Sequence, residues 1–331
     1  MIVSHVNWGL IGPGAIAEKF ARDIRLVSKA RLVSVASSDP LRARSFGERF
    51  KVSKVADSYS QLLNDPGIDA VYIATIHPTH YPIAKDALMA GKHVLIEKPL
   101  TMNAEQAKAL VSLARSRGLF LMEAMWTAFL PVTQAVRGLI ESKAIGPIQR
   151  LEGSFCISTA EESAKRLYDP ALGGGALLDL GVYPLSYAHM IMGSGYSAVS
   201  SAMTFTSKGV DRRTEIRLTY REGVMAALSC DMDSQTPISF KIYGDSGTIE
   251  VPHFLGATTY LLHRADGDTE QYSLPFRGEG FVEQIDASSE AIMNGQQESS
   301  LWPHQDTLSV LELMDTVRRA NALHYGSLES T

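Results

Sequence analysis

Short apolar runs alternate with amphipathic stretches along the first third of the chain. The apolar runs have the length of buried strands, and the segments between them have the period of helices. One helix is well marked, because Asn103 can cap its start and Gly118 can end it. Strands that alternate with helices at this spacing predict βαβ units and a parallel sheet. The predicted strands are Val6–Ile11, Arg31–Ala36, Ala70–Thr75, His93–Ile96 and Leu119–Glu123, and the first helices are Ala15–Val27 and Pro40–Phe50.

The pattern changes to a period of two after about residue 147. Ile216, Leu218 and Tyr220 fall on one face of a strand, and polar residues occupy the other face. This alternation is typical of an antiparallel sheet with one face open to water. The strands expected here are Thr214–Tyr220, Val224–Cys230, Ser239–Tyr243 and Thr248–Val251, and helices are expected at 176–192, 281–294 and 304–321.

The fold class is therefore α/β plus α+β. We expect an N-terminal domain at 1–125 with a parallel sheet. A second domain at 126–331 would carry a large, mostly antiparallel sheet covered by helices on one face. The boundary is expected between 124 and 147, with Gly146-Pro147 as a turn.

Composition narrows the class of protein. Hydrophobic residues make up 45% of the 331 residues and charged residues 20%, the balance of an ordinary globular protein. The net charge of −5 gives no indication of a basic surface that would bind nucleic acid. Cys156 and Cys230 lie far apart without metal-ligand spacing, which predicts a reducing compartment and no metal site. The first residues lack a signal-peptide pattern, and the longest apolar run, Ala70–Ile76, is too short to span a membrane. We expect a cytoplasmic protein without a membrane partner.

A glycine turn carries the first candidate site. Gly12, Pro13, Gly14, Ala15, Ile16 and Ala17 form a G-x-G-x-x-A pattern between the first strand and the first helix. Gly12 allows a tight turn, Gly14 lets the backbone approach a pyrophosphate, and Ala17 lets the helix pack closely on the strand. Backbone N–H groups at the helix start would face the phosphates. A glycine turn without a ligand is the alternative, but the position before a βαβ series favours a dinucleotide site.

The end of the second strand indicates which dinucleotide binds. NAD-specific folds usually place a carboxylate there to bind the ribose 2′-hydroxyl, but Ser37 occupies that position. The hydroxyls of Ser37 and Ser38, followed by Arg42, suit the 2′-phosphate of NADP. Asp39 could instead swing onto the ribose, or simply begin the helix at Pro40. The sequence therefore favours NADP, with NAD as the alternative.

Lys98 and a later helix supply the second candidate site. Lys98 follows the strand His93–Ile96, at the edge where parallel sheets bind ligands. Asp179 and Tyr183 are four residues apart and would share one face of a helix, although Pro184 removes one helical hydrogen bond. Three glycines at 173–175 suggest backbone packed close to a ligand, and Trp126 would place an aromatic ring near the cleft. Taken singly, a surface lysine, a buried Asp–Tyr pair and a core Trp are the simpler interpretations.

The chain resembles the family of glucose–fructose oxidoreductase and inositol dehydrogenase. The marks are "GLIGPGAIA", "AGKHVLIEKPL" and "GGGALLDLGVY" in that order, with "GFVEQIDASSEAIMNGQQES" near the end. Within the family, "LFLMEAMWTAFLP" and Tyr183 resemble the dihydrodiol dehydrogenases and the NADP-dependent D-xylose dehydrogenases. Many members carry a histidine where Tyr183 stands, which makes an inositol substrate doubtful.

The resemblance implies a hydride transfer between NADP(H) and a secondary alcohol or carbonyl of a sugar, polyol or trans-diol. Lys98, Asp179 and Tyr183 would be catalytic. Tyrosine has an unperturbed pKa of about 10, and a lysine ammonium within ~4–6 Å would lower it by about 1–3 units. Tyr183 would then exchange the proton, although Lys98 could do so directly. The other expected site residues are Thr75, His77, His80 and Glu97 at the cofactor, and Trp126, Arg166 and Tyr168 at the substrate.

Two other classes share this fold: a non-catalytic regulator that senses dinucleotides, and an NAD-dependent glycosidase. Retention of Lys98, Asp179 and Tyr183 weighs against the first, and Ser37 weighs against the second. The second domain is also expected to bind substrate and to form a homodimer or a dimer of dimers. The flanking helices alone are not expected to cover its sheet residues Ile216, Leu218, Val224, Leu228 and Phe240.

Overall fold

The computed structural model describes residues 5–331, so residues 1–4 of the N-terminal stretch lie outside the described part. The chain divides into two compact units. The first contains residues 5–126 and 276–307, and the second contains residues 127–275 and 308–330. The sequence predicts one domain for all of 126–331. In the structure, residues 276–307 belong to the first unit instead.

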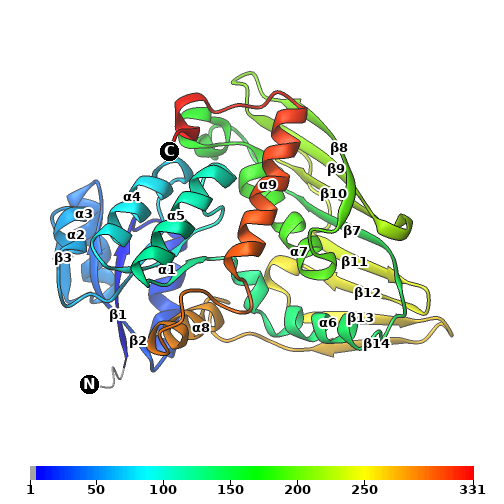
Figure 1. Cartoon of the computed structure of the whole chain (residues 1–331), viewed down its shortest axis with the longest axis horizontal. Helices are drawn as coiled ribbons and strands as arrows, with labels where there is room; N and C mark the ends of the chain where they lie inside the picture. Colours follow the sequence, from blue (N-terminus) through cyan, green and yellow to red (C-terminus); the bar gives the residue numbers. More distant parts are fainter. Residues whose placement is uncertain (1–4) are drawn as a thin grey trace. The chain divides into compact units, whose positions relative to one another are not determined.

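The first unit is a six-stranded parallel sheet in the order β3-β2-β1-β4-β5-β6, flanked by helices (Figure 1). This is the strand order of a Rossmann fold. The predicted strands and helices are present within a few residues, except that β3 and α3 were not foreseen. The strands are β1 (Val6–Ile11), β2 (Ala30–Ala36), β3 (Lys54–Ala56), β4 (Ala70–Ile73), β5 (His93–Ile96) and β6 (Leu121–Glu123); the helices are α1 (Ala15–Asp23), α2 (Pro40–Phe50), α3 (Tyr59–Leu63), α4 (His77–Met89), α5 (Ala104–Arg117) and α8 (Val282–Met293).

Local chemistry explains where these helices begin and end. The side chain of Asn103 accepts a hydrogen bond from the N–H of Gln106 at 2.9 Å, as a helix N-cap does. Gly118 ends α5 with a left-handed backbone, φ +66°. Both outcomes match the sequence prediction for this helix.

The second unit is built on an eight-stranded sheet in the order β14-β13-β12-β11-β7-β10-β9-β8. Only β7 and β10 pair in parallel, so the sheet is mostly antiparallel, as predicted. Helices α6 and α7 pack against it (Figure 1). The strands are β7 (Ile148–Cys156), β8 (Tyr196–Phe205), β9 (Asp211–Tyr220), β10 (Met225–Asp231), β11 (Ser239–Gly244), β12 (Gly247–Pro252), β13 (Thr259–Arg264) and β14 (Thr269–Ser273); the helices are α6 (Pro131–Glu141), α7 (Val182–Met192) and α9 (His304–Ala320), of which 308–320 belong to this unit.

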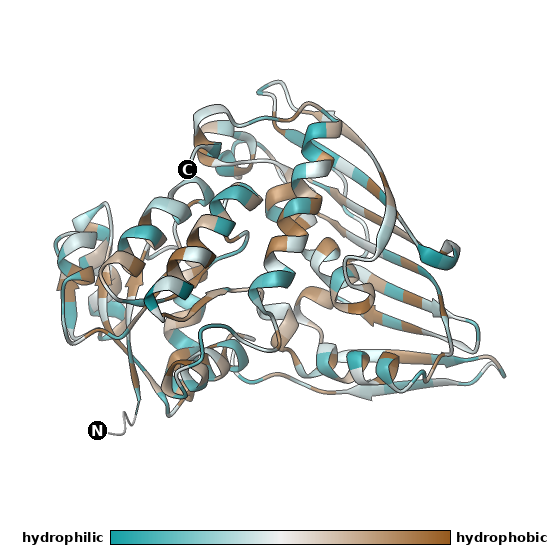
Figure 2. Cartoon of the chain, viewed as in Figure 1, coloured by the Kyte–Doolittle hydropathy of each residue, from teal (hydrophilic) through white to brown (hydrophobic). Residues whose placement is uncertain are grey.

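Hydrophobic and polar residues alternate along these strands, as Figure 2 shows by brown and teal segments. Ile216, Leu218, Leu228 and Phe240 are all at most 4% exposed within a single chain, whereas Val224 is partly exposed. The argument that these residues need a second subunit to cover them was therefore wrong, because helices of the same chain cover that face. The opposite face carries charged pairs such as Lys241 with Glu250, 3.0 Å apart. Dimerisation stays a prediction without that support.

Buried hydrogen bonds tie segment 276–307 to the rest of the first unit. Asp23 at the end of α1 is 1% exposed and accepts from the N–H groups of Glu279 and Phe281 at 2.8–2.9 Å. The indole N–H of Trp8 in β1 donates to Ser289 in α8 at 3.2 Å. Burial raises the pKa of Asp23, and the two N–H donors act in the opposite direction.

We expect Asp23→Ala to release this segment. The substitution leaves two backbone N–H groups without an acceptor, and each such buried group costs about 1–3 kcal/mol. Chemical denaturation should show a lower free energy of unfolding, and hydrogen exchange should become faster across 276–293. Asp57→Ala, at an exposed position, is the control. Unchanged exchange across 276–293 in Asp23→Ala would contradict this role.

Candidate functional site

The glycine turn lies between β1 and α1. Gly12 has φ +89°, and a Cβ there would lie 2.6 Å from Thr75 Cγ2. The chain itself therefore requires glycine at position 12. Ala17 is fully buried, as expected for close packing of the helix on the strand.

Gly14 gives a test of whether this loop fits a dinucleotide. Nothing in residues 5–331 lies within 4 Å of the place where a Gly14 Cβ would stand. Its φ of −101° is open to any residue, so neither strain nor packing explains the glycine. In the described chain, moreover, no side chain caps the start of α1. Backbone N–H groups beside an open position fit the close approach of a pyrophosphate.

The end of β2 shows how the residues expected at the ribose are held. Asp39 caps α2, and its Oδ1 accepts from the N–H of Leu41 at 2.9 Å and of Arg42 at 3.4 Å. The helix-start interpretation of Asp39 is thus the one found. Ser37 is buried and its Oγ accepts from the N–H of Asp39 at 3.1 Å, while Ser38 and the Arg42 side chain are exposed. The serine hydroxyls and the guanidinium retain donors for a ligand.

The segment after β4 contains the two candidate histidines. His80 is fully buried, with Nδ1 3.0 Å from the Pro99 carbonyl and Nε2 3.2 Å from the Thr75 carbonyl. Burial and the neighbouring His77 lower the pKa of His80 to about 3. A neutral ring carries one N–H, so it can donate to only one of these two carbonyl groups. A direct contact of His77 or His80 with a cofactor stays a prediction.

Lys98 is half-buried and directly follows β5 through Glu97. Glu97 is buried and accepts a hydrogen bond from the Tyr72 hydroxyl at 2.5 Å, so its carboxylate faces inward to β4. Glu123, at the end of β6, accepts from the N–H of Leu100 at 2.9 Å. Burial raises the pKa of both carboxyls, and the Lys98 ammonium acts in the opposite direction.

Glu123 is a site-supporting residue whose role the sequence did not reveal. Its other oxygen accepts from the Trp302 indole at 2.9 Å and from the Thr307 hydroxyl at 3.0 Å. One buried carboxylate thus fixes the backbone two residues after Lys98 to segment 276–307. These donors lie 179 and 184 residues further along the chain, so no local pattern could have indicated the contact.

Trp126 is partly exposed and packs within the first unit. Its ring lies 5.5 Å from that of Phe281 and 6.5 Å from that of Phe276. A Cβ on Gly280 would strike the indole, which explains the glycine there. The packing accounts for Trp126 without a ligand, and its substrate contact stays a prediction.

In the second unit the residues around Asp179 form a polar group. Arg166 donates to Asp179 Oδ1 at 2.9 Å, and their side chains are 37% and 14% exposed. Residues Leu177–Gly181 form a π-helical turn that leads directly into α7, which Tyr183 enters as its second residue. Tyr183 is 8% exposed and its ring lies edge-on to Phe155 at 5.8 Å. Such π turns are frequent at functional sites, and this one precedes Pro184, which cannot donate a helical hydrogen bond.

Packing within the chain explains two of the three glycines, Gly174 and Gly175. A Cβ at Gly174 would lie 2.5 Å from the Leu167 carbonyl oxygen. Gly175 has φ +113°, and a Cβ there would overlap Asp211 Oδ1. These two glycines are therefore explained without an adjacent ligand, and a ligand next to them stays a prediction.

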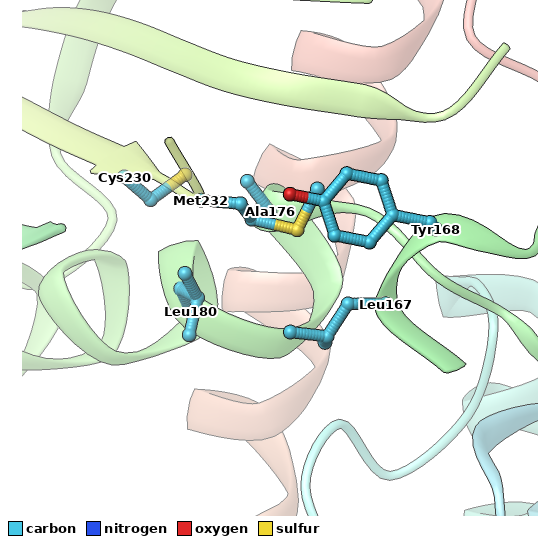
Figure 3. Close-up of a cluster of buried hydrophobic side chains, with 6 residues drawn as sticks. All are labelled: Leu167, Tyr168, Ala176, Leu180, Cys230 and Met232. Carbon is cyan, nitrogen blue, oxygen red and sulfur yellow. The ribbon is translucent and has the colours of Figure 1, made fainter. Parts of the chain in front are cut away.

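Tyr168 belongs to a buried cluster rather than to an open surface. Figure 3 shows this cluster, in which Tyr168 and its neighbours surround the start of the helical segment. The Tyr168 hydroxyl donates to the Thr159 carbonyl at 2.9 Å, so a substrate role for it stays a prediction. The members are Leu167, Tyr168, Ala176, Leu180, Cys230 and Met232.

No group of three or more His, Cys, Asp or Glu side chains in residues 5–331 is arranged to hold a metal ion. Among the helices described, none is both long and apolar enough to cross a membrane.

Comparison with known proteins assigns both halves of the chain. Residues 6–125 match the model of the oxidoreductase family with an NAD-binding Rossmann fold, and residues 133–250 match the GFO/IDH/MocA C-terminal domain. The trans-1,2-dihydrobenzene-1,2-diol dehydrogenase of Sus scrofa is 31% identical over 95% of this chain and 96% of its own length. The enzyme from Danio rerio is 29% identical over 97% and 98%.

Solved structures give the same assignment. The 3-ketoreductase KijD10 of Actinomadura kijaniata, crystallised with NADP and TDP-benzene, has a TM-score of 0.87 at 31% identity and covers 96% of this chain and 98% of its own. The aldose-aldose oxidoreductase of Caulobacter crescentus also has a TM-score of 0.87, but at 22% identity it supports the fold alone. Its coverage is 96% and 98%. The predicted resemblance, fold class and enzyme class are confirmed: this chain belongs to the Gfo/Idh/MocA family of oxidoreductases and its first unit is a dinucleotide-binding Rossmann domain.

Proposed function

We propose that this protein is an NADP-dependent dehydrogenase or reductase that acts on a secondary alcohol or carbonyl of a sugar, polyol or trans-diol. The observation that carries the proposal is the open position at Gly14, on the same sheet edge as Lys98. The bound dinucleotide supplies the acceptor or donor of hydride. Relatives named as diol dehydrogenases and a ketoreductase crystallised with NADP support both the reaction class and the cofactor.

The chain's own residues would then bind the cofactor and manage the proton. The Gly12–Gly14 backbone and the first turn of α1 hold the pyrophosphate. Tyr183 exchanges the proton of the substrate hydroxyl, and the Lys98 ammonium favours the phenolate form of a tyrosine close to it. Asp179, held by Arg166, orients substrate hydroxyls.

The substrate class is tested by an NADP⁺ reduction screen with D-xylose, D-glucose, inositols and trans-diols. We expect turnover of at least one sugar or trans-diol and little turnover of inositols. Tightly bound NAD in the purified protein, without net turnover, would instead indicate a glycosidase of this fold.

Cofactor preference should depend on Arg42. A charge-assisted hydrogen bond contributes about 1.5–3 kcal/mol, so one such bond to the 2′-phosphate gives at least about a tenfold preference for NADPH over NADH. Fluorescence titration should show that Arg42→Ala weakens NADPH binding by about tenfold and leaves NADH binding almost unchanged. Arg44→Ala, also exposed on α2, is the matched control. Equal dissociation constants of the unaltered protein for the two cofactors would refute the preference.

The proton carrier is tested by Tyr183→Phe. General acid–base catalysis contributes ~10²–10⁴-fold, so kcat should fall by that factor while NADPH affinity changes little. Tyr187→Phe is the control, since Tyr187 lies on the same helix but is fully buried against Phe240 and Phe254. Lys98→Met should also lower kcat and move the basic limb of the pH–rate curve upward.

The rival assignment makes Lys98 the direct acid–base group and Tyr183 a packing residue. It predicts that Tyr183→Phe changes activity by less than about tenfold, chiefly in KM. Measurement of kcat and KM for both variants between pH 6 and 10 separates the two assignments. A nearly unaltered kcat in Tyr183→Phe would exclude the tyrosine as proton carrier.

A further inference from the structure

A buried carboxyl group lies at the start of the helical segment that carries Asp179 and Tyr183. Asp211, the first residue of β9, is fully buried, and its Oδ2 accepts from the N–H of Leu177 and from the Thr214 hydroxyl, both at 2.7 Å. Leu177 is the first residue of the π turn. Asp211 therefore satisfies a backbone N–H at a helix start that would otherwise be buried without an acceptor.

The second oxygen of this carboxyl group, Oδ1, differs from Oδ2 in its hydrogen bonding. Asp211 Oδ1 is buried and has no hydrogen-bond partner among the described residues. It faces Gly175, where a Cβ would also lie 2.8 Å from the Tyr325 hydroxyl. That hydroxyl donates to the Gly174 carbonyl, so its oxygen can still accept a hydrogen bond. A neutral carboxyl could place its own proton on Oδ1. An ionised one keeps the two donors on Oδ2 but leaves Oδ1, which shares the buried charge, without a donor.

The other titratable and charged groups around Asp211 do not offset the advantage of its neutral form over its ionised form. Cys230 faces it from β10, and burial keeps that thiol protonated by raising its pKa. Arg318 from α9 is the cation that acts on Asp211, but this side chain is bound to Asp315 and Glu329. Burial outweighs the hydrogen bonds and Arg318, and it raises the pKa of Asp211 to about 6.

We propose that Asp211 is a positioning residue whose neutral carboxyl holds the first turn of the segment bearing Asp179 and Tyr183, and whose ionisation loosens that turn. The proposal rests on the function proposed above for Asp179 and Tyr183. It assigns no contact with substrate or cofactor to Asp211. The glycines at 174 and 175 allow the carboxyl and the Tyr325 hydroxyl to reach the turn.

Hydrogen exchange of segment 173–183 tests the proposed effect of Asp211 ionisation without any need for substrate turnover. A carboxyl that titrates near pH 6 when buried and near 3.8 when exposed stabilises the closed turn at low pH, and this contribution is lost as the pH rises to about 6. After correction for intrinsic rates, opening should be about tenfold more frequent at pH 7.5 than at pH 5. Asp211→Asn, which is neutral at both pH values, should abolish this dependence.

Asp231→Asn is the matched control, because Asp231 is a buried carboxylate in the same sheet that accepts from the N–H groups of Asp233 and Ser234. This variant should keep the pH dependence of segment 173–183. An equal pH dependence in Asp211→Asn, or none in the unaltered protein, would overturn the proposal.

Kinetics supply the second readout. In the unaltered enzyme kcat should contain an ionisation near pH 6 that Asp211→Asn lacks. Asp211→Ala removes the acceptor of Leu177 and should lower kcat at least about tenfold, and the asparagine variant should restore most of it. An unchanged inflection in Asp211→Asn would also overturn the proposal. If no substrate is turned over by the unaltered protein, the proposed function fails, while hydrogen exchange still decides on Asp211.

Discussion

Parallel pairing of β1, β2, β4 and β5 is the constraint on which the candidate site of the first unit depends. Strands that pair in parallel end at one edge of the sheet, so the segments that follow them meet there whatever their separation in sequence. Gly12, Ser37, Thr75 and Lys98 all follow or lie just beyond such strand ends. The pairing of backbones, rather than contacts among these side chains, therefore brings the candidate cofactor residues to one edge.

Three buried carboxyl groups hold loop segments in place by hydrogen bonds, as backbone pairing holds the strands of the sheet. Asp23, Glu123 and Asp211 each accept from backbone N–H groups of a segment distant in sequence. An orphaned buried N–H costs about 1–3 kcal/mol, so each carboxylate selects one loop conformation over alternatives that leave the donor unpaired. Burial raises the pKa of all three, so the ionised form of each carboxyl is disfavoured in this arrangement.

The sequence predicted what local patterns determine and missed what distant contacts determine. Regular periodicity and caps located α2, α5 and β5 closely, because the signals lie within each element. Strands β3, β7, β8, β13 and β14 were missed. Of these, β3 is too short for a period, and β8 is half-exposed along its length, with Ser, Ala and Thr in place of an apolar stripe. For the site, the motifs gave Gly12, Gly14 and the helix-capping alternative for Asp39. The motifs could not reveal the roles of Glu123 and Asp211, because the groups that donate hydrogen bonds to these carboxyls are distant in sequence.

The two candidate groups of residues differ in how they are held in place. In the first unit, the glycine turn and the strand ends are fixed by backbone hydrogen bonds, and the neighbouring His80 stays neutral far above its pKa of about 3. Around Asp179 and Tyr183, the support comes from side chains that can change charge or exchange partners: Arg166 pairs with Asp179, and Asp211 titrates in the range where many enzymes work. The π turn adds a stretch without the regular i→i−4 ladder between these supports. A change of pH near neutrality should therefore act on the proposed proton-handling residues through their own supports and leave the dinucleotide loop as it is.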